Sequence, residues 1–318
     1  TQMSVPPAST IKPLSIYTPA LEAGYDVDSM IMDDDTLTYG PTDYDVKNYD
    51  LYSAYAEIPM HRAIVESKNT TAVYLLDKMG IDKAVNKLAQ FGIHVREEDK
   101  IYGDIALGDM DGVSPLQMAS AYSTFANDGL RADPRIITKI VDATGAVVVD
   151  NTAVQTTRVV SSEIANKMTS ILLGVYAPGG TGYGAQPYNG MQVAGKTGTS
   201  EAIGEDGPYD RTKWMIAYTP DITVATWIGF DETTEENNLS DIGMMFYNLF
   251  SNEMGNLLNV SPSTTFAVGT VDEELGNQTP ESSWVDRVDG FIDQFTEFGG
   301  KVEEKSKEWF NRAVDFFR

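Results

Sequence analysis

Apolar residues recur at helical spacing through much of the first half of the chain. Residues 57–129 are therefore predicted to be mainly helical. Ser114 followed by Pro115, and Gly129 further on, are residue types typical of a helix start and a helix stop. Residues 161–176 predict one more helix, with a serine in the capping position.

Alternating apolar and polar positions predict strands later in the chain. Residues 135–150 (RIITKIVDATGAVVVD) predict a hairpin that turns at Thr144-Gly145. Strands within residues 193–229 follow one another through short connections, so we expect them to be antiparallel. Between two of them, residues 201–211 (EAIGEDGPYDR) predict a mobile loop. This loop could gate a site, or be a hairpin tip without such a role.

Two regions break the periodic pattern. Residues 26–56 are rich in Asp, Tyr and Gly and predict a loop with short elements. The run Asp33-Asp34-Asp35 within it predicts a solvated acidic turn, because no spacing typical of a metal site follows. Residues 260–283 are rich in Ser, Thr, Pro, Gly and acid and predict a linker.

The linker divides a domain of residues 1–259 from an amphipathic helix over 284–318. Apolar residues of that helix fall on one face: Trp284, Val288, Phe291, Ile292, Phe295, Phe298, Val302, Trp309, Phe310, Ala313, Val314 and Phe317. The helix could lie on a membrane surface, dock onto a partner, or pack on its own domain. The lack of a Lys/Arg excess favours packing on its own domain.

Composition narrows the function classes. The 318 residues carry a net charge of −24 and have a pI of about 4.3, which argues against nucleic-acid binding. A hydrophobic fraction of 42% is enough for a substantial core, and the chain has no cysteine. No apolar run is long enough to span a bilayer, and no cofactor or metal is implied.

Three short motifs carry the candidate chemistry. In order along the chain they are Ser9-Thr10-Ile11-Lys12, Ser67-Lys68-Asn69 and Lys196-Thr197-Gly198-Thr199. Serine-x-x-lysine, S-x-N and K-T-G in this order form the signature of serine acyl-transferases that open β-lactams or D-alanyl peptides. A Ser-His-Asp arrangement is not favoured, since His61 and His94 lie in segments that predict ordinary helix or turn.

The first motif pairs a nucleophile with a base. Ser9 and Lys12 are three residues apart and so lie on one helical face. Pro13 is tolerated only in a first turn, so the helix must begin close to Ser9, at the positive end of its dipole. A lysine can act as base when burial or a second cation lowers its pKa, and Lys196 of the third motif would supply such a positive charge beside Lys12.

The second and third motifs require particular local structure. Ser67 and Asn69 can converge only if the chain turns between two helices, and Thr70 or Thr71 would then cap the second helix. In the predicted strand of the third motif, Thr197 and Thr199 share a face. Gly195 and Gly198 weaken a strand unless another backbone approaches closely, as an extended peptide substrate would.

With these motifs the chain resembles the transpeptidase domain of class A penicillin-binding proteins, close to the "2a" type of streptococci and lactic-acid bacteria. The similar segments are STIKPLSIYTPALEAG, AIVESKNTTAVYLLDKMG, ALGDMDGVSPLQMASAYSTFANDG and KWMIAYTPDITVATWIGFD. The resemblance implies an α/β fold: a central antiparallel sheet flanked by helices, with a largely helical subdomain that holds Ser67 and Asn69. Only eight residues precede Ser9, so the family's N-terminal strands, glycosyltransferase domain and membrane helix are expected to be missing.

The resemblance also implies a role for each motif residue. Ser9 would be acylated by the penultimate D-alanine of a peptidoglycan stem peptide, or by a β-lactam, with Lys12 as base. Ser67 and Asn69 would assist proton transfer and bind the peptide, and Lys196 with Thr197 would bind and orient the substrate. The substrate-binding residues would be Asn69, Thr197, Gly198 and Thr199, with the backbone N–H groups of Ser9 and Thr199 forming an oxyanion hole. The family usually has glycine before the nucleophile, where this chain has Ala8.

Several alternatives stay open. A D,D-carboxypeptidase or a β-lactamase could use the same scaffold, and an incomplete domain could bind without turnover. The expected location is the extracytoplasmic face of a bacterial membrane, with the anchor in a missing N-terminal part. Cell-division or elongation machinery is a possible partner.

Overall fold

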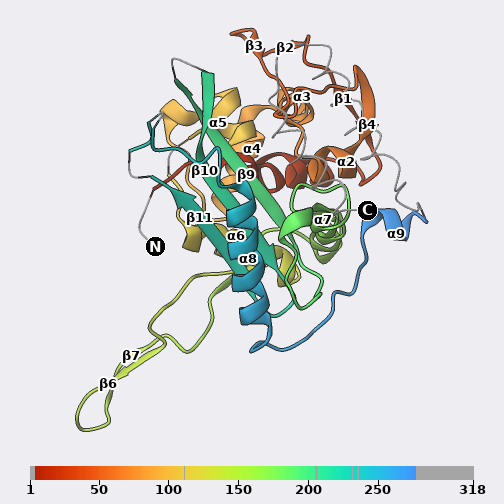
Figure 1. Ribbon diagram of the computed structural model, residues 1–318. Coiled ribbons are helices and arrows are strands. Elements are labelled where there is room, and N and C mark those ends of the chain that lie inside the picture. The colour runs from red at the N-terminus through yellow and green to blue at the C-terminus, as the bar shows by residue number, and fades with distance from the viewer. Residues whose placement is uncertain (1–3, 111, 205–206, 231, 235, 277–318) are drawn as a thin grey trace, which may run out of the picture. The chain divides into compact units, whose positions relative to one another are not determined.

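The computed structural model describes residues 4–110, 112–204, 207–230, 232–234 and 236–276 (Figure 1). They form one compact unit, and the second unit, from Gln278 to Arg318, lies outside the described residues. The predicted amphipathic helix over 284–318 falls in that second unit and stays a prediction.

The chain begins with a nearly continuous helical segment. It comprises the 3₁₀ turn η1 (Ala8–Ile11), the π-helical turn η2 (Pro13–Tyr17) and helix α1 (Thr18–Glu22). The 3₁₀ turn η1 changes to the π-helical turn η2 at Pro13, a residue that has no backbone N–H to donate. The predicted helix start near Ser9 is confirmed.

Small sheets and helices follow, as predicted for residues 26–129. Strand β1 (Met30–Asp33) pairs with β4 (Ala56–Pro59), and β2 (Thr38–Tyr39) pairs with β3 (Tyr44–Asp45). The helices are α2 (Met60–Val65), α3 (Asn69–Met79), α4 (Ile81–Gln90), η3 (Glu97–Asp99), α5 (Tyr102–Leu107) and α6 (Pro115–Ala126). Ser114 caps α6 in a capping box with Gln117, which confirms the predicted helix start.

A hairpin then projects from the body of the unit (Figure 1). Its strands are β6 (Lys139–Val141) and β7 (Val147–Asp150), and Gly145 turns between them with a φ of +86°, as predicted. At its base β5 (Leu130–Ala132) pairs with β8 (Thr156–Arg158). Helix α7 (Ser162–Leu173) follows, capped by Ser161, and then η4 (Gly174–Tyr176) and η5 (Tyr183–Ala185).

The main sheet is antiparallel, as predicted. Its order is β11 (Thr223–Gly229), β10 (Gly207–Tyr218) and β9 (Ala194–Gly204). Residues 201–204 and 207–210, predicted as part of a mobile loop, are instead paired strand, with Glu201 opposite Asp210. Backbone pairing thus overrides the loop preference of their glycines and charges.

Helices cover both faces of this sheet. On one face Tyr218 contacts Phe125 of α6 and bonds Thr169 of α7. On the other face Thr226, directly opposite Met215, donates to Glu253 of helix α8 (Gly243–Leu258), which crosses the sheet in Figure 1. Residues 214–218 of β10 are consequently all buried.

The predicted linker begins as part of the folded unit. Residues 260–276 include helix α9 (Val271–Glu274), and the Val271 side chain is buried. The boundary at 260–283 itself stays a prediction.

The expected solvated acidic turn at residues 33–35 was wrong for Asp33, which is fully buried, whereas Asp34 and Asp35 are partly exposed. It accepts hydrogen bonds from Asn48, Ala54 and Thr70, which explains how a carboxylate is tolerated there.

Candidate active site

Ser9 lies in the tight turn η1, and its neighbours are fixed by backbone contacts. Ala8 has a left-handed φ of +49°, and its N–H donates to the Gly108 carbonyl. The N–H and hydroxyl of Thr10 both donate to the Pro7 carbonyl, and Tyr122 donates to the Thr10 carbonyl. The left-handed backbone at position 8 favours glycine, which gives a physical reason for the family's usual residue there. Ser9 itself is half-buried and so remains reachable.

The nucleophile turn packs directly on strand β9. A Cβ placed on Gly198 would lie 3.0 Å from Thr10 Cγ2 and 3.2 Å from Thr10 N. On Gly195 it would lie 1.8 Å from the Ile216 carbonyl oxygen of β10. Both glycines therefore admit a close backbone, as expected, and the neighbouring backbone in this structure is that of Thr10 and Ile216. Gly198 brings the first and third motifs side by side.

Lys12 reaches the second motif. Its Nζ donates to Asn69 Oδ1 at 2.6 Å, to the Ser67 carbonyl at 2.8 Å and to the Lys68 carbonyl at 3.3 Å. The Lys12 side chain is fully buried. A neutral amine has only two N–H donors, so the two shortest contacts would leave its lone pair free to accept a proton.

Lys196 completes a bridge through Ser67. Its Nζ donates to Ser67 Oγ at 2.8 Å and to the Thr197 carbonyl at 2.9 Å. Ser67 has a left-handed φ of +58° in the turn between α2 and α3, which is the predicted turn. Such a backbone is costly for a residue with a side chain and is common at functional sites. One serine thus contacts both lysines, through its carbonyl and its hydroxyl.

The electrostatics of the two lysines agree with this arrangement. Burial, and secondly the positive charge of Lys196, hold the pKa of Lys12 well below its usual value, against a smaller upward pull from Asp109. Burial also lowers the pKa of Lys196 to about 7. The expected like-charge effect of Lys196 is present, although burial is the larger cause.

Asn69 is held at both ends of its carboxamide. Its Oδ1 accepts from Lys12, and its Nδ2 donates to the Lys47 carbonyl at 2.9 Å. Among the residues that the structure describes, the second Nδ2 hydrogen has no acceptor. The cap predicted from Thr70 or Thr71 is wrong, because Asn48 Oδ1 accepts from the Asn69 and Thr70 N–H groups instead.

The two threonines of the third motif do share a face, as predicted. Thr197 lies opposite Met215 and Thr199 opposite Lys213, whereas Lys196 lies opposite Ile216 and points to the other face. The Thr197 hydroxyl contacts that of Thr181 at 2.7 Å. In the described part of the chain the Thr199 hydroxyl has no hydrogen-bond partner, which leaves it for a ligand.

The described residues were compared with two other kinds of site, a metal centre and a catalytic histidine. No group of three or more His, Cys, Asp or Glu among them could hold a metal ion. His61 is buried, its ring contacts the Val27 carbonyl at 3.0 Å, and its Nε2 lies 3.5 Å from Asp272. None of the described helices is long and apolar enough to cross a membrane.

Comparison with known families matches residues 1–249 to the model "Penicillin binding protein transpeptidase domain". The chain belongs to this family. It is 34% identical to penicillin-binding protein 2a of Streptococcus pneumoniae over 338 aligned residues, which cover 100% of this chain and 45% of that protein. The chain thus spans less than half the length of this curated relative.

Solved structures show the same α/β fold. The penicillin-binding protein PonA1 of Mycobacterium tuberculosis superposes with a TM-score of 0.71 at 24% identity, over 85% of this chain and 73% of that chain. Penicillin-binding protein A of M. tuberculosis, in a penicillin G acyl-enzyme complex, superposes with a TM-score of 0.59 at 25% identity, over 71% of this chain and 55% of that chain.

Some residues of this transpeptidase domain's site were not found from the sequence. Asn48, Asp33 and Thr181 position the motif residues, yet each lies in a segment without periodicity. The Asp33-Asp34-Asp35 run predicts a surface turn and gives no sign that Asp33 is buried. For Thr181 alone the sequence offers an indication: it follows Gly179-Gly180, and glycines allow a backbone to approach other segments closely.

Proposed function

We propose that this domain is a peptidoglycan D,D-transpeptidase that works through an acyl-enzyme on Ser9. One observation carries the assignment: Lys12, Ser67, Asn69 and Lys196, from three separate motifs, form one hydrogen-bonded cluster whose two lysines are fully buried. Family membership and the penicillin G acyl-enzyme of a fold relative support it.

In the proposed acylation, neutral Lys12 accepts the Ser9 hydroxyl proton while Ser9 Oγ attacks the carbonyl of the penultimate D-alanine. Burial and the neighbouring Lys196 favour the neutral form of this lysine. Backbone N–H groups of Ser9 and Thr199 would stabilise the oxyanion, since Gly198 holds their segments together. The Asn69 Nδ2 and Thr199 hydroxyl would bind the peptide.

The leaving D-alanine amine needs a proton. Because Ser67 Oγ accepts from Lys196, its own hydrogen is free to point toward the substrate, and Lys196 can replace it. An amine of a second stem peptide would then attack the Ser9 ester, release Ser9 and form the cross-link. With a β-lactam, Ser9 breaks the amide bond of the ring, and the nitrogen that leaves stays covalently attached to the acyl group on Ser9. We place the reaction on the extracytoplasmic face, where peptidoglycan is built.

The test is the intact mass of the chain after incubation with benzylpenicillin, with Ser9→Ala as control. We expect one antibiotic adduct on the wild type and none on the variant. A lasting adduct together with cross-linked product from stem peptides supports the transpeptidase. Trimmed peptide or rapid antibiotic destruction would instead indicate a carboxypeptidase or a β-lactamase. No adduct on a folded chain would contradict the proposal and favour binding without turnover.

A further inference from the structure

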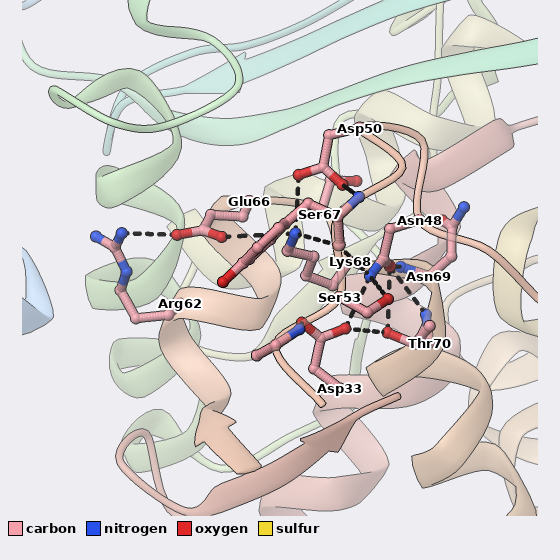
Figure 2. A network of polar contacts seen from close by, with 12 residues as sticks. Asp33, Asn48, Asp50, Ser53, Arg62, Glu66, Ser67, Lys68, Asn69 and Thr70 are labelled. Carbon is pink, nitrogen blue, oxygen red and sulfur yellow. Dashed lines mark hydrogen bonds and ion pairs between the residues drawn. The ribbon is translucent and has the colours of Figure 1, made fainter. Parts of the chain in front are cut away.

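The loop of residues 47–53, between β3 and β4, contacts the Ser67-Lys68-Asn69 motif at several points (Figure 2). The Lys47 carbonyl accepts from Asn69 Nδ2 at 2.9 Å, and Asn48 accepts from Asn69 N at 2.7 Å. A third contact joins Asp50 to the Lys68 ammonium at 2.8 Å. The loop therefore holds the backbone and side chain of Asn69 together.

Asn48 is the centre of these contacts. Its side chain is only 2% exposed and both ends of its carboxamide are used. Oδ1 accepts from the first N–H groups of α3, at Asn69 and Thr70, and so supplies the helix cap. Nδ2 donates to Asp33 Oδ1 at 2.8 Å, to the Tyr52 carbonyl at 2.9 Å and to Ser53 Oγ at 3.1 Å.

Lys68 forms a second arm of the same loop. It is the middle residue of the motif and is 2% exposed, and its ammonium points toward Asp50 (Figure 2). It is bound by Asp50 and by the Tyr52 carbonyl at 3.0 Å, and it lies 5.0 Å from the centre of the Tyr52 ring. Asp50 is half exposed, so this arm can be altered without opening the core.

We propose that Asn48 is a positioning residue for the transpeptidase site, acting through Asn69 on Lys12. It touches no reacting group. It fixes the first turn of α3, and this places Asn69 Oδ1 2.6 Å from Lys12 Nζ. Asp33 in turn fixes which end of the Asn48 carboxamide faces α3, because a carboxylate can only accept. This inference rests on the proposed function, because the step that Asn48 would affect is the acylation of Ser9.

The experiment exchanges the two polar partners. Asn48→Asp alone places two carboxylates in contact in the core and removes the donor to Asp33. The double variant Asn48→Asp/Asp33→Asn restores one donor and one acceptor between positions 33 and 48, and keeps an acceptor for the α3 cap. Asn151→Asp is the matched control, since Asn151 Nδ2 donates to the Ile137 carbonyl in the distant hairpin.

The readout is acylation by a fluorescent penicillin, separated into the initial binding constant and the acylation rate constant. For Asn48→Asp we expect an acylation rate constant about 10–100-fold lower with binding changed less than about threefold, because misplacing catalytic groups slows the chemical step. The double variant is expected to recover most of the rate, and Asn151→Asp to match the wild type. Asp50→Asn removes the carboxylate charge that pairs with Lys68 but keeps an acceptor for the Tyr52 N–H, and should slow acylation about threefold.

Amide hydrogen exchange keeps this test separate from the proposed function. Even if the wild type is not acylated, the amides of Asn69 and Thr70 should exchange at least about tenfold faster in Asn48→Asp, and be protected again in the double variant. A folded Asn48→Asp with wild-type acylation and exchange would overturn the proposal. A double variant that is acylated no faster than Asn48→Asp would also overturn it. A double variant that fails to fold would do so as well, because Asn48 would then serve only the fold.

Discussion

Ser67 links two buried lysines at the residue scale. Lys12 bonds its carbonyl and Lys196 its hydroxyl, both at 2.8 Å. Two ammonium groups so close in the core repel each other, so the second proton is bound weakly. The sequence suggested this repulsion, whereas the larger effect of burial required the fold.

The rate of acylation should therefore depend on pH through these lysines. The rate rises with pH as Lys12 loses its proton. Replacing Lys196 with Met removes a positive neighbour, which raises the pKa of Lys12. The rising limb of the profile of acylation rate against pH then moves to higher pH. Lys196→Arg keeps a positive charge at every pH of the profile and should not move the limb to higher pH. The measurement is acylation rate against pH for all three proteins, and an unmoved limb in Lys196→Met would refute the electrostatic coupling.

The three motifs could be predicted from the sequence because the chemistry demands fixed residue types at fixed spacing. The residues that position them could not. Asn48 lies 21 residues before Asn69, and Asp33 lies 15 residues before Asn48. They meet only because the loop between β3 and β4 folds back onto α3. No periodic pattern in the sequence predicts this conformation of the loop.

At the scale of elements, the nucleophile turn η1 depends on two close backbone approaches. One is at Gly198 of β9 and the other at Gly108, the left-handed residue that ends α5 with a φ of +80°. A Cβ on Gly108 would lie 2.3 Å from the Ala8 carbonyl oxygen. The position of Ser9 is therefore set by backbone packing around it, and not only by the helix to which it belongs.

Gly108→Ala tests this dependence. The clash with Ala8 and the left-handed backbone should together destabilise the domain by about 2–4 kcal/mol and displace Ser9, so that acylation falls more than tenfold. Gly24→Ala is the control: its φ is +99° but nothing lies within 4 Å, so only about 1 kcal/mol and no acylation should be lost. Chemical denaturation and penicillin labelling measure both. Equal losses in the two variants would show that the close approach has no special role.

On the scale of the whole folded unit, the segment of residues 260–276 crosses the predicted domain boundary and adds to the core. Thr264 bonds Asp221 through its N–H at 2.9 Å and its hydroxyl at 2.8 Å. Phe266 packs edge-on against Tyr218, with ring centres 5.9 Å apart, and Ser170 donates to the Gly269 carbonyl at 2.7 Å. Composition alone predicts a linker here, because isolated apolar residues among Ser, Thr and Pro form no periodic pattern.

A comparison of two truncated chains decides where the domain ends. A chain of residues 1–259 loses the buried Val271 side chain and uncovers Tyr218, whereas a chain of residues 1–276 keeps both. Burial of a valine contributes about 2 kcal/mol, so we expect the shorter chain to unfold roughly 4–8 °C lower. Acylation well below the transition should be the same, because the segment contributes no residue to the site. Equal unfolding temperatures would instead support the boundary at residue 259, with the segment resting on the domain without stabilising it.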